Sequence, residues 1–172
     1  MRKLVFLLLF PGMVLFSGQI WGQIISFYRV ENVPEEISEI NAMAFDKDSV
    51  LWMGTNKGLL KMQGGKIIQV YDQSRPLIYA INSLYIDDQN TKWLGTYTSS
   101  IVRFTDSTDL EVISFLEYTD NEYELVTGLA RYKNTIWVTT ASGQLFSYDL
   151  ETKQLKERHA PDCESIYDLK VY

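Results

Sequence analysis

The sequence predicts an all-β chain, a partial β-propeller of about three four-stranded antiparallel blades plus one extra strand. A tryptophan motif recurs three times, an apolar segment recurs upstream of each copy, and apolar residues alternate with a period of two. The copies of the motif are LWMGTNKGLL at 51–60, KWLGTYTSSI at 92–101 and IWVTTASGQL at 136–145. Each copy has Trp, an apolar residue, Gly or Thr, and a Thr three places after the Trp. Three matches at similar spacing indicate duplication.

The spacing of the repeat is that of a propeller blade. Trp52, Trp93 and Trp137 lie 41 and 44 residues apart. The upstream segments are INAMAF at 40–45, INSLYI at 81–86, VTGLARY at 126–132 and IYDLKVY at 166–172. Their starts are separated by 40 to 45 residues. A four-stranded blade has this length, and helical repeats of similar length are the competing interpretation.

Periodicity favours strands over helices. In INAMAF, Ile40, Ala42 and Ala44 alternate with the other three residues, and Leu84 and Ile86 follow the same rhythm in INSLYI. The apolar runs are short and end at turn clusters such as DKDS and DDQN. No window keeps the helical period of about 3.6 residues with capping residues at its ends.

Each unit therefore divides into four strands joined by short hairpins. We expect the strands of the first unit at 40–45, 51–55, 59–62 and 66–71. Those of the second are expected at 81–86, 92–96, 101–104 and 112–118, and those of the third at 126–132, 135–139, 145–148 and 154–158. The units then span about 40–80, 81–125 and 126–165, and residues 166–172 form the first strand of a fourth.

The residues shared by the copies have structural roles in this arrangement. Each Trp stands near the start of a second strand, where a large flat side chain fills the space against the neighbouring blade. The threonines that follow, which suit a pleated strand and can form local hydrogen bonds, are Thr55, Thr96 and Thr140. Gly58 and Gly143 provide a turn in which positive φ costs glycine little. Ser99 holds that place in the second unit, so its turn must differ or be strained.

The first residues are typical of an export signal. MRK provides positive charge, LVFLLLFPGMVLF a short apolar run, and SGQIWGQ small and polar residues. We expect cleavage near Gly22, so that residues 1–22 are a signal peptide, 23–39 a lead-in strand and loop, and 40–172 the partial propeller. The expected location is periplasmic or extracellular, with no membrane span beyond the signal segment.

Composition argues against several classes of function. Among 172 residues, 22 Asp and Glu against 16 Lys and Arg give a net charge of -6, which disfavours nucleic acid as a partner. The single cysteine, Cys163, allows no internal disulfide, and the single histidine, His159, removes most metal and triad chemistry. The sequence also lacks hydrolase, phosphate-loop and dinucleotide motifs. We therefore predict no enzyme activity, no catalytic residues, no cofactor and no metal site.

The acidic residues fit turns and loops better than a calcium site. Asp46 with Asp48, and Asp87 with Asp88, are the pairs most suggestive of calcium. Carboxylates that cap their own hairpin turns explain them better, because a calcium loop needs about six or more regularly spaced oxygen ligands. We expect two solvated acidic groups, one in the lead-in (Glu35, Glu36 and Glu39) and one in an exposed loop between the second and third units (Glu117, Asp120, Glu122 and Glu124).

The first unit resembles a known repeat. INAMAFDKDSVLWMGTNKGLLKM, residues 40–62, is similar to the two-component regulator propeller repeat of periplasmic sensor regions in hybrid histidine kinases, and SFYRVENVPEEISE before it resembles that family's lead-in. The second copy keeps Trp93, Gly95 and Thr96, whereas the third has Thr139 where the family has Gly. The resemblance covers about residues 24–172 and implies a seven-bladed propeller that senses glycans or other nutrients. Because three units and one strand do not close a ring, we expect a fragment of a longer product, or a ring completed by another chain.

The predicted function is an exported ligand-binding or sensor module, a fragment of a larger two-component sensor. A glycan or another small extracellular ligand would contact polar residues at the starts of the innermost strands, which are Asn41, Asn82, Thr127 and Tyr167. Packing at the edge of the core is the competing explanation for each residue. The alternative functions are a propeller-fold lyase or hydrolase fragment, and a scaffold that binds itself or a partner chain through an open blade face.

Overall fold

The computed structural model describes residues 4–9, 25–30, 33–71, 80–105, 110–119, 121–158 and 169. The chain divides into two compact units, Met1–Glu36 and Ile37–Tyr172. In the first unit, β1 (Leu4–Leu9) pairs antiparallel with β2 (Ile25–Val30). β1 lies in the stretch assigned to the export signal, and β2 in the predicted lead-in. The export signal itself stays a prediction.

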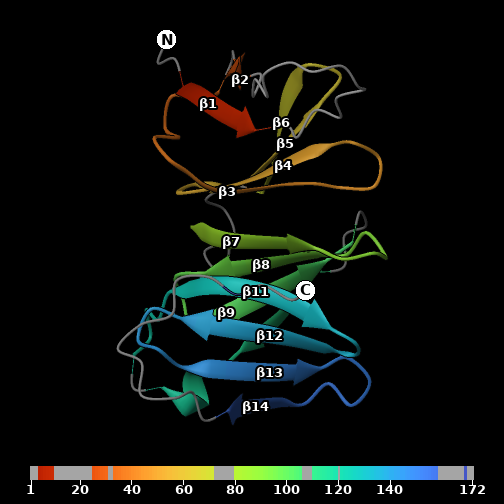
Figure 1. Ribbon diagram of the computed structural model, residues 1–172. Helices are drawn as coiled ribbons and strands as arrows, with labels where there is room; N and C mark the ends of the chain where they lie inside the picture. Colours follow the sequence, from red (N-terminus) through yellow and green to blue (C-terminus); the bar gives the residue numbers. More distant parts are fainter. Residues whose placement is uncertain are drawn as a thin grey trace, which may run out of the picture. The chain divides into compact units, whose positions relative to one another are not determined.

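The second unit contains three four-stranded antiparallel sheets, each with its strands in chain order (Figure 1). The first sheet consists of β3 (Ile40–Phe45), β4 (Leu51–Thr55), β5 (Gly58–Gln63) and β6 (Lys66–Tyr71). The second consists of β7 (Ile81–Ile86), β8 (Lys92–Thr96), β9 (Ser100–Phe104) and β10 (Leu110–Ser114). The third consists of β11 (Val126–Tyr132), β12 (Thr135–Thr140), β13 (Leu145–Asp149) and β14 (Leu155–Arg158).

The sheets confirm the all-β class, and each strand but one of those expected between residues 40 and 158 begins and ends within a residue of its expected bounds. The exception is the strand predicted at 112–118, because β10 ends at Ser114 and a 3₁₀ helix, Leu116–Tyr118, follows. Phe115 leaves the sheet at this point. Its backbone N–H donates to the Ser99 carbonyl at 2.9 Å, and its buried ring stacks on Phe146 with centroids 4.9 Å apart.

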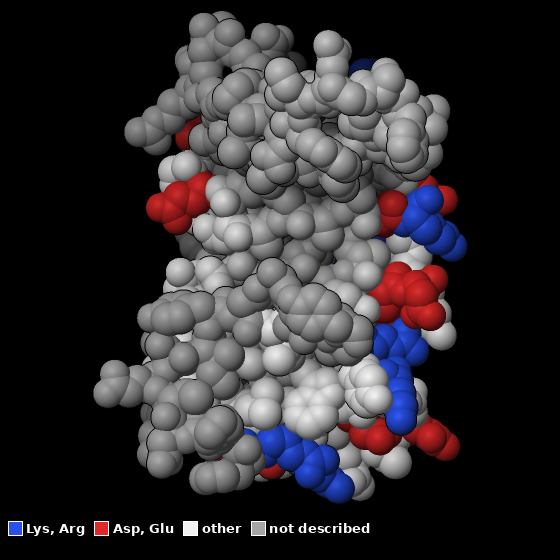
Figure 2. Space-filling view, in the orientation of Figure 1, with Lys and Arg blue, Asp and Glu red and all other residues white. Residues whose placement is uncertain are grey.

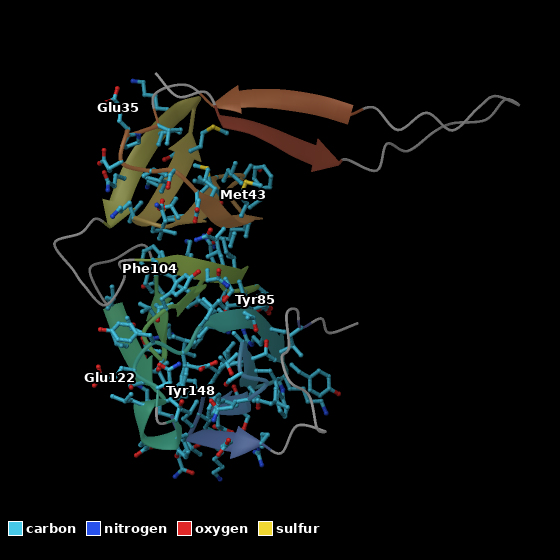
Figure 3. All side chains as sticks on the ribbon, turned by 90° about the vertical axis from the view of Figure 1, so that its left-hand side faces the viewer. Glu35, Met43, Tyr85, Phe104, Glu122 and Tyr148 are labelled. Atoms are coloured by element: carbon cyan, nitrogen blue, oxygen red, sulfur yellow. The ribbon has the colours of Figure 1, made fainter. Side chains whose placement is uncertain are left out.

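Each pair of successive sheets encloses its own hydrophobic core. Between the first and second sheets lie Val50, Trp52, Leu59, Ile81, Leu94, Val102 and Phe104. Between the second and third lie Trp93, Ile101, Ile113, Phe115, Val126, Leu129, Ile136, Val138, Phe146 and Tyr148. Figure 3 labels one member of each core, Phe104 of β9 and Tyr148 of β13. The sheets are therefore held together face to face by apolar burial.

Each recurring tryptophan was expected to fill the space against a neighbouring blade, and the first two copies do so. Trp52 is buried and meets Phe104 edge to face, with ring centroids 5.4 Å apart. Trp93 is buried in the same way, and its ring lies 6.2 Å from that of Tyr148. Phe104 and Tyr148 occupy equivalent places in β9 and β13. Trp137, the third copy, is half-buried.

The glycine two places after the first two tryptophans allows neighbouring sheets to approach closely. A Cβ on Gly54 would lie 2.5 Å from Cγ2 of Ile81, the first residue of the next sheet. A Cβ on Gly95 would lie 2.8 Å from the Cβ of Val126, the equivalent residue one sheet further on. Both contacts are shorter than van der Waals distance, so the motif requires glycine where a neighbouring strand approaches.

In the third sheet, the glycine lies on the neighbouring strand and not after the tryptophan. Thr139 occupies the place of the two glycines and is buried, and its register partner on β11 is Gly128. The corresponding register pairs are Ala42 with Gly54 and Ser83 with Gly95. A Cβ on Gly128 would lie 2.7 Å from the Thr139 hydroxyl. The departure of Thr139 from the repeat pattern is therefore compensated across the strand pair.

Several expectations concern residues outside the described ranges. These are most of the signal segment, Cys163, His159, Tyr167 and all of 166–172 except Leu169. Within the described ranges, none of the helical structure has the length and hydropathy that a membrane crossing would require.

Candidate functional site

Three of the predicted ligand-binding residues occupy one repeated position. Asn41, Asn82 and Thr127 are the second residues of β3, β7 and β11, and at each of them the strand pairing shifts register. Such β-bulges redirect a side chain. Asn41 Nδ2 donates to the carbonyl of Ile81 at 3.0 Å, and Asn82 Nδ2 donates to that of Val126 at 3.0 Å. The two asparagines therefore tie each innermost strand to the next sheet.

Thr127 and Tyr167 complete the predicted set. The Thr127 hydroxyl lies 3.2 Å from that of Thr139, on the neighbouring strand of its own sheet. Tyr167 lies outside the described residues. The predicted residues thus share a place in the repeat, but those described bind separate protein groups instead of converging on one point.

The repeated threonines organise the turns that follow them. Thr55 Oγ1 donates to the Gly58 carbonyl at 2.8 Å, and Thr96 Oγ1 donates to that of Ser100 at 2.9 Å. In the third sheet the backbone N–H of Gln144 donates to Thr140 Oγ1 at 3.2 Å. Gly58 and Gly143 have φ of 110° and 83°, values that glycine adopts at little cost. These residues therefore shape the loops at one edge of the sheets.

The turn aspartates bind the recurring tryptophans, a contact that sequence reasoning missed. Asp46 Oδ1 accepts the N–H groups of its own turn, from Asp48 and Val50, as predicted. Its Oδ2 accepts the Trp52 indole N–H at 2.8 Å. Asp87 and Trp93 repeat this contact at 3.2 Å. A six-residue spacing from Asp to Trp, present in two copies, was the available signal.

A cation from the following sheet joins each of these aspartates. Lys92 Nζ, fully buried, lies 3.9 Å from Asp46 Oδ2 and 4.7 Å from the centre of the Trp52 ring. Burial acts to raise the pKa of Asp46, but hydrogen bonds from Trp52 and the turn backbone, with the charge of Lys92, hold that pKa below its ordinary value. Arg131 Nη1 lies 3.2 Å from Asp87 Oδ2. The carboxylates of Asp46 and Asp87 thus link neighbouring sheets.

At the edge opposite the turn aspartates, a serine in a strained backbone conformation, Ser99, holds together the loops of the second and third sheets. Ser99 has φ of 48°, which confirms the strain expected where serine replaces glycine. Its Oγ donates to the Asn121 carbonyl at 2.5 Å and accepts the Glu124 N–H at 3.1 Å. Its carbonyl accepts the Phe115 N–H. These bonds fix the β8–β9 turn against the β10–β11 connection.

Three large apolar side chains are exposed around this serine. Tyr97 is 42% exposed, Leu116 is 46% exposed and Tyr123 is 71% exposed. Each lies within two residues of Ser99 or of a residue bonded to it, and the loops that carry the three side chains are here called the loop surface. Exposed apolar patches on an ordered scaffold are typical of binding sites.

Glu124 is buried and holds the loops of the loop surface in place, contrary to the prediction that it is exposed. Glu124 was predicted to be exposed, but it is only 4% exposed. Its carboxylate accepts the Ser142 N–H at 2.9 Å and faces the Asn121 amide at 3.4 Å, so burial is compensated by hydrogen bonds. Glu117 and Glu122 are exposed, as expected, and Figure 3 labels Glu122 at this edge. Asp120 lies outside the described residues.

Among the described residues, no three His, Cys, Asp or Glu side chains lie together in a way that could hold a metal ion.

Comparison with known proteins identifies the fold. No protein-family model and no curated protein sequence matches the chain. A solved structure named as the extracellular domain of a hybrid two-component system from B. thetaiotaomicron aligns with a TM-score of 0.63 and 20% identity, covering 79% of this chain and 18% of that one. A second such domain from the same organism aligns with a TM-score of 0.55 and 25% identity, covering 70% and 16%.

The WD40 repeats of RRP9 align with a TM-score of 0.65 and 12% identity, covering 79% of this chain and 42% of that one. Because WD40 repeats are β-propellers, the three sheets are blades of a partial propeller, as predicted. The chain spans less than a fifth of the two extracellular domains it resembles.

Proposed function

We propose that this chain is an exported recognition module of a sensor related to two-component systems, and that it binds a saccharide at the loop surface without catalysis. The observation that supports this most is the exposure of Tyr97 and Tyr123 on loops held by the buried Ser99 and Glu124 network. Tyrosine rings pack well against the apolar faces of sugar rings, and a fixed site loses little entropy on binding.

The fold comparison and the repeat support the sensor assignment. The similar extracellular domains align with 79% and 70% of this chain, and residues 40–62 resemble the regulator propeller repeat. Their extracellular location, with the basic and apolar N-terminus of this chain, supports export to the periplasm or cell surface. A sensor module needs selective binding and no turnover, which agrees with the lack of catalytic motifs in the sequence.

A glycan array of neutral oligosaccharides, followed by calorimetry on the best ligand, tests this proposal. Tyr97→Ala and Tyr123→Ala should each weaken binding about tenfold, a loss of roughly 1.4 kcal/mol of stacking. Tyr132→Ala is the matched control, because Tyr132 is 50% exposed but lies at the other edge of the sheets, and it should bind normally.

Chromatography of the ligand after incubation distinguishes the alternatives. An intact ligand is expected. Release of shorter products would favour the hypothesis of a lyase or hydrolase. If no glycan binds and the chain forms a stable assembly in size-exclusion chromatography, the hypothesis of a scaffold is favoured.

A further inference from the structure

A pocket of about 370 Å³ lies between the second and third blades, at the edge opposite the loop surface. Its lining comes from the turns that follow β7, β11 and β13 and from neighbouring residues of strands β8, β9, β10, β11 and β13. Acidic and basic side chains alternate along this side of the described surface in Figure 2, where β7 and β11 end in Figure 1. The volume is near the lower end of the range for small-molecule sites.

One of the two carboxylates in the lining has no acceptor capacity left. Asp87 Oδ1 accepts the backbone N–H groups of Gln89 at 3.0 Å and Thr91 at 2.8 Å. Its Oδ2 accepts the Trp93 indole N–H and Arg131 Nη1, each at 3.2 Å. A carboxylate has about four lone-pair sites, and all four are used. Asp87 therefore holds the pocket together and leaves little for a ligand to donate to.

The other carboxylate, Glu111, holds its partners loosely. It accepts Arg103 Nη1 at 3.3 Å, the Tyr148 hydroxyl at 3.4 Å and Lys153 Nζ at 3.5 Å. The Arg103 side chain is 41% exposed and that of Lys153 is 67% exposed. Ion pairs of this kind contribute only about 0–1 kcal/mol, so a ligand can replace them.

The Tyr148 hydroxyl remains a hydrogen-bond donor in this pocket at neutral pH. Burial raises the pKa of Tyr148, and the charge of Glu111 raises it further, so the phenol keeps its proton at neutral pH.

The basic side chains of the pocket carry more donors than the described residues accept. Arg131 donates through Nε to the Lys133 carbonyl and through Nη1 to Asp87 and Asp88. Among the described residues Arg103 donates only through Nη1, and its guanidinium lies 6.0 Å from the centre of the Trp93 ring. A guanidinium has five donors, so both arginines retain N–H groups without an acceptor among the described residues. With Lys153, the lining has three cations against two carboxylates, on a chain with a net charge of -6.

We propose that this pocket binds a small molecule through a carboxylate. Arg103 and Lys153 bind this carboxylate, and the Arg131 N–H groups that have no acceptor among the described residues lie nearby. A uronic acid and a short dicarboxylic acid share this chemistry. Guanidinium groups suit the ligand because they bind carboxylates with two parallel hydrogen bonds. The site is separate from the loop surface, so this proposal does not depend on saccharide binding there.

Calorimetry of the full chain with galacturonate, succinate and galactose tests the proposal. Galacturonate, succinate or both should bind, with an affinity that falls as salt rises, whereas galactose should not. Binding of both acids would assign recognition to the carboxylate alone, and binding of galacturonate alone would add contacts to the sugar ring. Equal affinity for galactose and galacturonate, or no binding of either acid, would overturn the proposal.

Variants of opposite sign identify the site. Arg103→Gln and Lys153→Gln should each weaken binding of the acid by on the order of fivefold, whereas Glu111→Gln should strengthen it by a similar factor, because it removes the competing carboxylate. Lys66→Gln makes the same charge change at an exposed position in the first blade and should have no effect. Glu111→Gln binding no tighter than wild type, or Lys66→Gln matching Lys153→Gln, would contradict the assignment.

Discussion

Replacing Trp93 with alanine should lower the free energy of unfolding by about 3–5 kcal/mol, the usual cost of truncating a buried aromatic side chain. Trp93 is 1% exposed, its side chain packs against the third blade, and its indole N–H donates to Asp87. Removal opens a cavity between two blades and leaves the aspartate short of one donor. Urea unfolding followed by circular dichroism measures the change.

Two further variants separate the contributions of Trp93. Trp93→Phe retains an aromatic ring but loses the hydrogen bond to Asp87, so its effect should lie between that of alanine and wild type. Tyr132→Ala removes a side chain that is 50% exposed and should change stability by no more than about 0.5 kcal/mol. If Trp93→Ala cost no more than Tyr132→Ala, the indole would not be filling the space between blades.

Replacing Gly95 with valine should destabilise the protein by about 3 kcal/mol or more, because it adds side-chain atoms where there is no room. Even the Cβ would overlap the Ser83 hydroxyl in its own blade and lie 2.8 Å from the Cβ of Val126, a branched side chain on the first strand of the next blade. The second and third blades would have to separate to relieve the contact. Thermal and urea unfolding would both record the loss.

Gly65 provides the matched control for this prediction. It has φ of 74°, and a Cβ there would meet nothing within 4 Å. Because asparagine tolerates such a backbone conformation, Gly65→Asn should cost less than about 1 kcal/mol. A Gly95→Val variant as stable as Gly65→Asn would show that the blades do not approach as closely as described.

The strands could be predicted because their signals are local. INAMAF and INSLYI alternate with the period of a strand, and Asp-containing turns end them. β10 was placed wrongly because Phe115 is as apolar as a strand residue, and only its long-range contacts with Ser99 and Phe146 take it out of the sheet. Local pattern cannot report such contacts.

The candidate sites were harder to predict because they depend on contacts between blades. Asn41 and Asn82 are conspicuous polar residues in the sequence, yet their amides bind the next blade. The buried position of Glu124 depends on Ser142, 18 residues later. The pocket brings Arg103, Glu111 and Lys153 together from separate strands and turns. No periodicity marks these residues as neighbours.

Hydrogen exchange of the indole N–H groups, followed by NMR of nitrogen-15-labelled protein, tests most directly whether the recurring tryptophans lie between blades. Trp52→Phe and Trp93→Phe assign the two signals. Both N–H groups should exchange far more slowly than a free indole, because each is buried and bonded to an aspartate. Exchange of both at the rate of free indole would contradict the packing of these tryptophans between blades.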